Sequence, residues 1–394
     1  MPQNDWLAHC SELLSGRSRR NLLRNRKIVQ PIDSTHVEIE GRRFINFSAN
    51  NYLGLSHHSR MIEALHRSQH AGTGASAAGL ISGYTQLHAQ AESTLARWKG
   101  TETAVLFPSG YQANLGAVQA LAAIGETYRN GARFLIDKLS HASLIDAVRA
   151  TESTLRVFPH NGIAKLRRLL EDADGDQLQI VLTESIFSMD GDAAELKQIA
   201  DLKREFPFVL LLDEAHGSGV YGDNGAGLAS ESGLQNTVDI SIVTLSKAIG
   251  IAGGAVCSST VFRDAILNFG RAYIFSTSVM PAVAACAIEA VSILRDEPQR
   301  QKRVRKLSTY VRAELEKSKL NIPPGDSPIV PVISGSEESA MKAAERLQKK
   351  GLLIFAVRPP TVPKGASRLR VTLSCDHTDA EIEQLLESLK KLSS

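Results

Sequence analysis

Short apolar runs recur along the middle of the chain, between Thr103 and about Ser259, and segments with helical spacing separate them. The runs predict strands over residues 103–107, 133–138, 179–184, 208–213, 240–246 and 253–258. Strands that alternate with helices in this way indicate a mainly parallel sheet covered on both faces. The continuous run Phe208–Leu212 is typical of a strand that is buried on both sides.

The pattern changes around residues 280–300, where a second unit is expected. A helix is predicted over Pro281–Leu294, a charged segment follows from Arg300 to Lys306, and a further helix is predicted over Glu337–Lys350. Strands are predicted over 328–334, 352–357 and 369–373. Thr378 and Glu381 have the spacing of a capping box that opens the last helix. These elements predict a smaller α+β domain.

The first fifty residues have their own pattern. Residues 6–24 predict an amphipathic helix, and Val37–Phe47 predicts a hairpin around Gly41. We therefore expect an N-terminal helix and hairpin segment at 1–49, a large domain at 50–285 and a C-terminal small domain at 286–394.

Composition excludes several classes of protein. The 394 residues are 43% hydrophobic and 22% charged, as in ordinary globular proteins, and the net charge of +3 gives no basic footprint for nucleic acid. No window approaches the apolar length of a membrane span. The four cysteines are far apart and show no metal-ligand or disulfide spacing. A reducing cytosol is the expected location, and no metal site is expected.

Polar residues that suit catalysis follow three of the predicted strands. Asp213 ends the run 208–212, Lys247 follows the strand 240–246, and His141 comes soon after residues 134–137. The carboxyl ends of strands carry the sites of open α/β folds. Each residue also has an ordinary interpretation: a helix cap for Asp213, a solvent-reaching side chain for Lys247, and a capping or core histidine for His141.

Lys247 suggests a specific cofactor. An ammonium at the end of an apolar strand is costly to desolvate unless it is paired, and a lysine amine can form a Schiff base with pyridoxal phosphate. That cofactor also needs a carboxylate on its pyridine nitrogen, a role that Asp213 fits. His216, three residues further on, could contact the ring oxygen or the imine.

A phosphate site is indicated where the strand 103–107 meets the next helix. Ser109 and Gly110 would open that helix, and backbone N–H groups at a helix N-terminus suit a phosphate. The alternative is an ordinary serine cap without a ligand. Gly72–Gly79 superficially resembles a dinucleotide loop, but its spacing is wrong and no strand precedes it, so we interpret it as a flexible substrate loop.

Taken together, the segments Leu106–Asn114, Asp213–Gly217 and Thr244–Gly250 resemble the fold-type I pyridoxal phosphate enzymes, and within them the α-oxoamine synthases. The resemblance extends from about Leu23 to the C-terminus. The other segments that carry it are Asn50–Ser56, Leu139–Ser143, Thr183–Asp192 and Ile274–Thr277.

The resemblance implies an α/β fold-type I transferase with a large mainly parallel-sheet domain and a smaller α+β C-terminal domain. It implies that Lys247 binds the cofactor covalently, that Asp213 contacts the ring nitrogen, and that His141 stacks on the ring and also adjoins the substrate. Cofactor contacts are further implied for Ser109, Gly110, Tyr111, Ser188, His216 and Thr244. Ser276 and Thr277 would reach the cofactor of a neighbouring subunit in a homodimer. Substrate contacts are implied for Arg24, Asn50, His141, Thr361 and Arg370.

The family condenses an amino acid with an acyl-CoA thioester and releases CO2. The segments Arg358–Pro363 and Ser367–Arg370 favour a member that uses L-alanine and a pimeloyl thioester, carried by CoA or by an acyl carrier protein. A member that joins glycine to acetyl-CoA is the nearest alternative, and sphingoid-base and aminolevulinate synthases are further ones. Arg368 and Arg370 share one face of their strand, so the pattern alone does not choose between them. Position 275 is phenylalanine where some relatives have tyrosine.

A different class remains as a competing hypothesis. A non-enzymatic α/β nucleotide-binding protein would use the Gly72–Gly79 loop. Such a protein has no need for Lys247, Asp213 and His141 together, so the enzyme hypothesis accounts for more of the sequence.

Overall fold

The apolar runs in the middle of the chain form a seven-stranded sheet in the computed structural model, which describes residues 5–128, 130–173 and 175–392. The strand order is β4-β10-β9-β8-β7-β5-β6. All neighbouring pairs are parallel except those of β10, which runs antiparallel to both β4 and β9. The strands are β4 (Thr103–Phe107), β5 (Ala132–Asp137), β6 (Thr154–Phe158), β7 (Leu178–Glu184), β8 (Val209–Asp213), β9 (Ile240–Thr244) and β10 (Gly254–Ser258).

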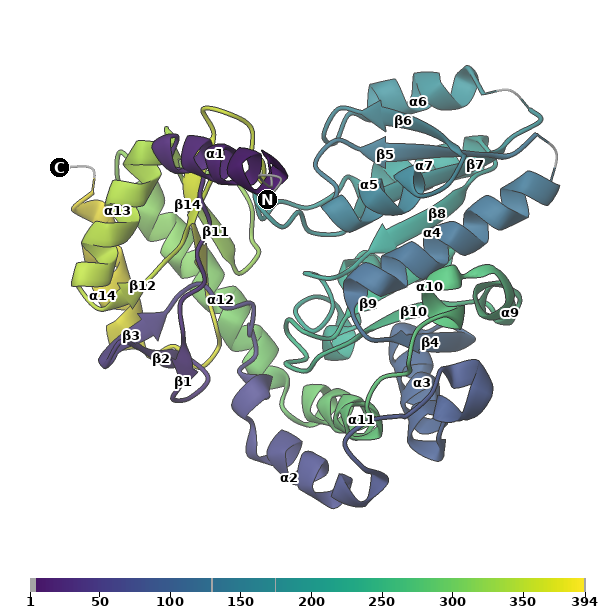
Figure 1. The fold of residues 1–394 in the computed structure, drawn as a ribbon, viewed down its shortest axis with the longest axis horizontal. Coiled ribbons are helices and arrows are strands. Elements are labelled where there is room, and N and C mark those ends of the chain that lie inside the picture. Colours follow the sequence, from purple (N-terminus) through teal and green to yellow (C-terminus); the bar gives the residue numbers. More distant parts are fainter. Residues whose placement is uncertain (1–4, 129, 174, 393–394) are drawn as a thin grey trace. The chain divides into compact units, whose positions relative to one another are not determined.

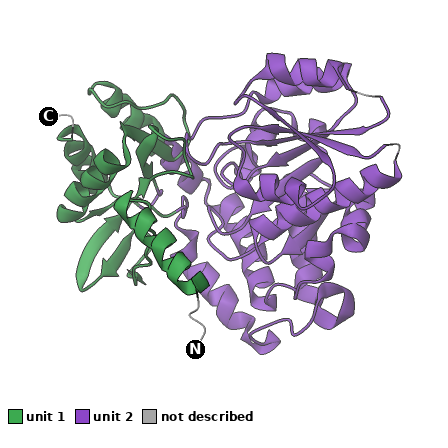
Figure 2. Ribbon diagram, turned by 45° about the horizontal axis from the view of Figure 1, so that its top comes forward, with its two compact units in different colours: residues 1–49, 307–373, 377–394 green, residues 50–306, 374–376 purple. Residues whose placement is uncertain are grey.

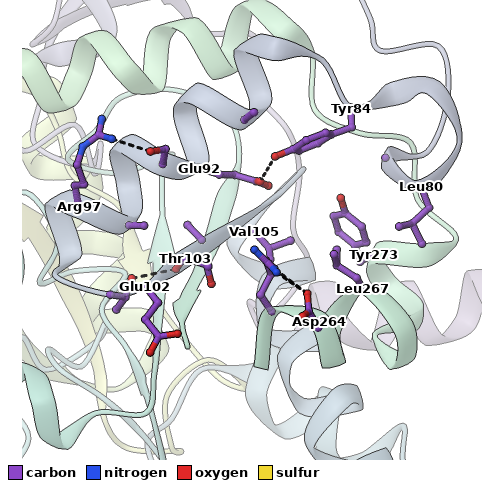
Figure 3. A pocket seen from close by; sticks show the side chains of 17 residues that line it. Leu80, Tyr84, Glu92, Arg97, Glu102, Thr103, Val105, Asp264, Leu267 and Tyr273 are labelled. Carbon is purple, nitrogen blue, oxygen red and sulfur yellow. Dashed lines mark hydrogen bonds and ion pairs between the residues drawn. The ribbon is translucent and has the colours of Figure 1, made fainter. Parts of the chain in front are cut away.

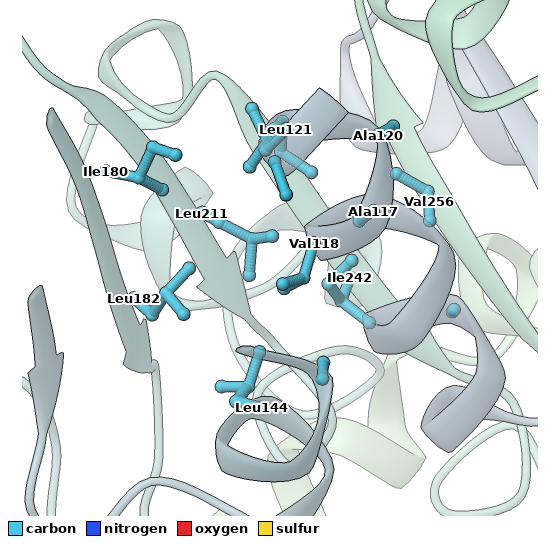
Figure 4. Close-up of a cluster of buried hydrophobic side chains, with 14 of the residues drawn as sticks. Ala117, Val118, Ala120, Leu121, Leu144, Ile180, Leu182, Leu211, Ile242 and Val256 are labelled. Carbon is cyan, nitrogen blue, oxygen red and sulfur yellow. The ribbon is translucent and has the colours of Figure 1, made fainter. Parts of the chain in front are cut away.

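Alternate residues of these strands pack against helices on opposite faces of the sheet. Ile180 and Leu182 of β7 belong to the cluster that includes residues of α4, α5 and α9, and Figure 4 shows this cluster between α4 and the strands. Val181 between them packs with residues of α6 and α7 on the other face. The two-residue period of the strands therefore builds a core on each side.

Helices connect these strands, and further helices precede β4 and follow β10 in the chain. They are α2 (Ser59–Arg67), α3 (Gln86–Lys99), α4 (Gly110–Thr127), α5 (Ala142–Arg149), α6 (Ile163–Glu171), α7 (Leu196–Glu205), α8 (Leu228–Glu231), α9 (Thr260–Phe269), α10 (Arg271–Ile274), α11 (Pro281–Asp296) and α12 (Pro298–Glu316).

The second unit combines both ends of the chain. Its four-stranded sheet has the order β1-β2-β3-β12, and its three-stranded sheet has the order β11-β14-β13 (Figure 1). Its elements are α1 (Asp5–Arg19), β1 (Gln30–Pro31), β2 (His36–Ile39), β3 (Arg42–Asn46), β11 (Ile329–Gly335), α13 (Glu337–Lys349), β12 (Leu352–Leu353), β13 (Ala356–Val357), β14 (Ser367–Thr372) and α14 (Asp379–Lys390). The hairpin of β2 and β3 and the capping box of α14 are as predicted.

The chain divides into units differently from the expected ranges 1–49, 50–285 and 286–394. Residues 1–49, 307–373 and 377–394 form one compact unit, and residues 50–306 and 374–376 form the other (Figure 2). Parallel pairing of β3 with β12 attaches the N-terminal hairpin to the C-terminal part. The helix α11 remains with the large unit because it packs on α2 and α3.

Several elements differ from their predictions. The strand β6 and the helix over the charged segment, α12, were not predicted. The first helix ends at Arg19 rather than at residue 24, and Asn21 has a positive φ of 54°. The expected strand 352–357 is two short strands, β12 and β13, that belong to different sheets. Among the described residues, no helix has the length and apolar character needed to cross a lipid bilayer.

A buried ion pair lies within the large unit. The Nζ of Lys99 donates to Glu214, and both side chains are almost fully buried. Removal of one partner leaves an uncompensated charge in the core, so we expect Lys99→Met to lower the free energy of unfolding by about 3–5 kcal/mol. Denaturant unfolding measures this effect. Lys203→Met, which removes the more exposed pair with Asp239, is the control and should cost less than about 1 kcal/mol.

A double variant separates charge from packing. Lys99→Met combined with Glu214→Gln removes both charges and should recover part of the lost stability. A double variant as unstable as the single one would contradict the buried-charge explanation.

Candidate active site

Four segments of the large unit bring polar side chains to one edge of the sheet. Asp213 is the last residue of β8 and Glu184 is the last residue of β7, and the two residues are register partners. His141 follows the end of β5 as the cap of α5, and Lys247 lies three residues beyond β9. Because parallel strands end at the same edge, these segments define a site of the kind expected for open α/β folds.

Asp213 is held at this edge with both of its oxygens accepting hydrogen bonds. The side chain is 3% exposed. Oδ2 accepts from the Nδ2 of Asn114, at 2.8 Å, and Oδ1 accepts from the backbone N–H of Ala215, at 2.9 Å. The carboxylate is therefore fixed in orientation within the core, as a partner for a ring nitrogen must be.

Glu184 lies beside Asp213 and contacts the histidine. It accepts a hydrogen bond from the backbone N–H of His141. Burial and the charge of Asp213 raise the pKa of Glu184 to about 8, and the charge of Lys247 acts in the opposite direction. Burial and Lys247 lower the pKa of His141, while Asp213 opposes that shift. The charges of Asp213 and Lys247 therefore act on both Glu184 and His141 within one site. The lowered pKa of His141 favours its neutral imidazole.

The expected phosphate site lies at the N-terminus of α4. The Oγ of Ser109 accepts a hydrogen bond from the backbone N–H of Gln112, at 3.2 Å, as a cap does. A Cβ on Gly110 would collide with the hydroxyl of Thr244, so glycine lets the helix end lie against the end of β9. Tyr111 is partly exposed, and its hydroxyl donates to Asp146 at 3.0 Å. The structure thus brings together Ser109, Gly110 and Thr244, and anion binding by this helix end stays a prediction.

His216 is joined to Asn50 through a tyrosine. The hydroxyl of Tyr52 lies 2.6 Å from the Nδ1 of His216 and 3.1 Å from the Oδ1 of Asn50. Tyr52 and His216 are both buried. Two residues predicted for different ligands, the cofactor and the amino acid, therefore belong to one hydrogen-bonded group.

Ser188 lies in the loop after β7. A histidine, His160, links this loop to the end of β5. The Nδ1 of His160 lies 3.1 Å from Asp137, at the end of β5, and its Nε2 lies 2.7 Å from Asp192, in the Ser188 loop. Burial lowers the pKa of His160, but its hydrogen bonds to the two carboxylates outweigh this effect and raise the pKa to about 10. His160 was not singled out in the sequence.

This pair of contacts predicts a pH dependence of stability. The folded pKa of about 10 lies above the ordinary value of 6.5, so protonated His160 contributes fully below pH 6.5 and its contribution falls as the pH rises toward 10. We expect the free energy of unfolding to decline over that range, and to decline less in His160→Gln. Urea titrations of both proteins at pH 6.5, 8 and 10 test this; parallel curves would contradict it.

Ser276 lies beside the N-terminal turn of α4 of its own chain, and Thr277 follows it. The Nε2 of Gln112 donates to the Oγ of Ser276 at 3.4 Å, and Thr277 forms a bridge with Ala78. The next residue back, Phe275, is 72% exposed.

The predicted substrate residues Arg24 and Thr361 meet within the small unit. The Nη2 of Arg24 lies 3.3 Å from the Oγ1 of Thr361, although 337 positions separate them. Arg358 also donates to the backbone carbonyl of Asn21. Arg370 and Arg368 of β14 are both buried, so neither faces solvent.

A cavity of about 430 Å³ in the large unit lies elsewhere, among α3, β4, α9 and α10 (Figure 3). Glu92 accepts hydrogen bonds there from the hydroxyl of Tyr84, at 2.7 Å, and from the backbone N–H of Leu106, at 2.8 Å. Burial raises the pKa of Glu92 to about 7. Apart from Gly79, at the end of the loop Gly72–Gly79, no residue predicted for cofactor or substrate lines this cavity, so we assign the active site to the strand ends instead.

The residues at the strand ends fit pyridoxal phosphate on structural grounds. A buried, oriented carboxylate, a lysine and a glycine-lined helix N-terminus are present at one sheet edge. The Oδ1 of Asn114, next to Asp213, has no hydrogen-bond partner among the described residues, which leaves an acceptor for a bound group. The sequence analysis included Glu184, Asn114 and Tyr52 only within longer segments and predicted no role for them. Glu184 ends an apolar run, as Asp213 does, so its position at the sheet edge could have been predicted from the sequence.

The comparison with family models defines the class. The model described as aminotransferase class I and II matches residues 42–389, which include every predicted site residue except Arg24. The fold agrees: a serine palmitoyltransferase from S. paucimobilis, solved with a bound aldimine of pyridoxal phosphate and myriocin, has a TM-score of 0.91 at 27% identity and covers 98% of each chain.

A curated relative and a further solved structure narrow the class. The 8-amino-7-oxononanoate synthase of Lysinibacillus sphaericus is 37% identical over 374 residues, which are 95% of each chain. A solved 8-amino-7-oxononanoate synthase from Francisella tularensis has a TM-score of 0.76 at 25% identity and covers 88% of this chain and 97% of its own. The chain therefore belongs to the aminotransferase class I and II family and, within it, to the 8-amino-7-oxononanoate synthases.

Proposed function

We propose that this protein catalyses the decarboxylative condensation of L-alanine with a pimeloyl thioester, which gives 8-amino-7-oxononanoate, CO2 and the free thiol of CoA or acyl carrier protein, as a step of biotin biosynthesis. Pyridoxal phosphate is the cofactor. The observation that carries this proposal is the joint position of Lys247, Asp213 and His141 at the carboxyl edge of a parallel sheet. The names of the relatives support the choice of substrates.

Each of these residues at the carboxyl edge of the sheet has a distinct role. Lys247 holds the cofactor and, once L-alanine has taken its place, accepts the α-proton on Nζ. Asp213, fixed by Asn114 and Ala215, keeps the ring nitrogen protonated. When bound, pyridoxal phosphate supplies the electron sink for the bond broken at the α-carbon.

The remaining cofactor residues orient the ring. His141, in its neutral form, would lie against one face of the ring, and His216 with Ser188 would provide polar contacts at its oxygen. Ser109, Gly110, Tyr111 and Thr244 bind the phosphate at the end of α4. Ser276 and Thr277 contribute to the site of a neighbouring subunit in a homodimer.

Four residues are assigned to substrate recognition. Arg370 binds the alanine carboxylate through its planar guanidinium, with Asn50 as a second contact. Arg24 and Thr361, which contact each other, bind the acyl substrate. We place the enzyme in the cytoplasm, which suits its four free thiols.

A substrate panel tests the proposal directly. Alanine, glycine and serine are each combined with pimeloyl-CoA, acetyl-CoA and palmitoyl-CoA, and the products are identified by mass. Pimeloyl-CoA with alanine should give the product faster than any other pair. Preferred turnover of glycine with acetyl-CoA would favour the alternative of a 2-amino-3-oxobutyrate CoA ligase, and pimeloyl-ACP as a fourth donor distinguishes the two carriers.

The carboxylate contact gives a more specific prediction. Arg370→Lys keeps the charge but loses the two parallel hydrogen bonds, so alanine binding should weaken by about 1.5–3 kcal/mol, or roughly ten- to a hundredfold. The absorbance change on titration of alanine into the cofactor-loaded enzyme measures this.

Arg368→Lys is the matched control, because it changes the other buried arginine of the same strand face. Normal alanine binding by Arg370→Lys, together with weak binding by Arg368→Lys, would transfer the role to Arg368.

A further inference from the structure

A chain of hydrogen bonds links Asp213 to His141 through Asn114 and Ser143. The Nδ2 of Asn114 donates to the Oδ2 of Asp213, at 2.8 Å, and to the Oγ of Ser143, at 2.9 Å. The Oγ of Ser143 lies 2.7 Å from the Nδ1 of His141. Asn114 is 2% exposed and Ser143 is 1% exposed, so water competes little with these contacts.

The direction of each bond follows from the groups involved. A carboxylate accepts only, so the amide nitrogen of Asn114, rather than its oxygen, faces Asp213. The same NH2 group gives its second hydrogen to the Oγ of Ser143. That hydroxyl is then supplied with one donor and can give its own hydrogen to the Nδ1 of His141.

A backbone group confirms the direction at the histidine. The backbone N–H of Ser143 lies 3.2 Å from the Nδ1 of His141 and can only donate. A proton on Nδ1 would therefore face another N–H, whichever way the serine hydroxyl turns. The neutral imidazole consequently carries its proton on Nε2, at the far side of the ring from Ser143.

We propose that Asn114 and Ser143 are positioning residues that connect the carboxylate of Asp213 to the imidazole of His141 and fix that imidazole as the tautomer protonated on Nε2. The two groups expected at the ring nitrogen and at one face of the cofactor ring are thereby oriented by one relay: Asp213 as a pure acceptor and His141 as a donor through Nε2. This inference rests on the proposed function for the chemical role of the relay. The hydrogen bonds of the relay themselves join protein residues only.

The charged surroundings agree with a neutral ring. Burial and the charge of Lys247 lower the pKa of His141, and the charges of Asp213 and Asp146 oppose them. The relay adds a specific restraint to this balance, because it supplies donors only to Nδ1.

Nitrogen NMR of the full-length protein with 15N-labelled histidine tests the relay. His141 is identified by the resonances that are missing in His141→Gln. Spectra are recorded on the protein with pyridoxal phosphate and again after its removal, so a failure of the proposed function does not prevent the test. We expect the Nδ1 of His141 to be unprotonated and its Nε2 protonated at pH 7.5 in the cofactor-free protein.

Two serine variants, three positions apart, separate the relay from ordinary packing. Ser143→Ala removes one donor to Nδ1 and should raise the fraction of His141 protonated on Nδ1 roughly two- to tenfold. Ser140→Ala is the matched control: Ser140 is also buried, but its Oγ has no hydrogen-bond partner among the described residues. It should leave that fraction unchanged.

Asn114→Ala should shift the tautomer in the same direction as Ser143→Ala, because the hydroxyl of Ser143 loses its donor. A parent protein protonated on Nδ1, or a Ser143→Ala spectrum identical to that of Ser140→Ala, would overturn the relay. A changed Ser143→Ala spectrum with an unchanged Asn114→Ala spectrum would overturn the part assigned to Asn114.

Discussion

Replacement of Lys247 by alanine is expected to abolish turnover while the protein still folds. Lys247 lies beyond the end of β9. Its charge acts to lower the pKa of both His141 and Glu184, so its amine belongs to the same site as these two residues. Loss of the amine removes both the covalent attachment of the cofactor and the base for the α-proton. We expect a decrease in kcat of at least about 10³-fold.

Product formation measured by mass, together with circular dichroism of the variant, checks this prediction. Lys197→Ala, which changes an exposed lysine of α7, is the control and should retain parental activity. Borohydride reduction of the loaded enzyme should place the pyridoxyl label on the peptide that contains Lys247. A label on another lysine would refute the assignment.

Asp213→Asn is expected to lower the rate by about 10²–10⁴-fold while binding of pyridoxal phosphate persists. An amide cannot hold the ring nitrogen protonated as a carboxylate does, so the ring becomes a poorer electron sink. The structure adds a second reason. The Nδ2 of Asn114 donates to Oδ2 of Asp213, and an amide nitrogen placed there would meet another donor.

Exchange of the α-proton of L-alanine in D2O isolates this step from the later condensation. Asp201→Asn, an exposed carboxylate of α7, is the control. Exchange at nearly the parental rate in Asp213→Asn would contradict the role of the carboxylate.

Much of the large unit could be predicted because its signals are local. The run Phe208–Leu212 is continuous and apolar, so β8 and the position of Asp213 at its end follow from a few neighbouring residues. The same reasoning placed Lys247 after β9 and His141 after β5. Strand ends of a parallel sheet then converge without any knowledge of distant contacts.

The missed elements lacked such signals. The strand β6 is at the edge of the sheet, and its burial is partial, so its residues do not form an apolar run. The helix α12 contains a charged stretch that concealed its spacing. The pairings Tyr52 with His216 and Asn114 with Asp213 join residues 164 and 99 positions apart, and only the fold brings them together.

The assembly of the small unit from both ends of the chain has a consequence for synthesis on the ribosome. The hairpin of β2 and β3 emerges early, but its parallel partner β12 is made only after residues 50–306, which are nearly all of the large unit, have been translated. Residues 50–306, which are contiguous, can reach their own contacts first. The apolar face of the nascent hairpin, with Val37, Ile39 and Phe44, therefore stays without Leu353 to cover it while the large unit is being made.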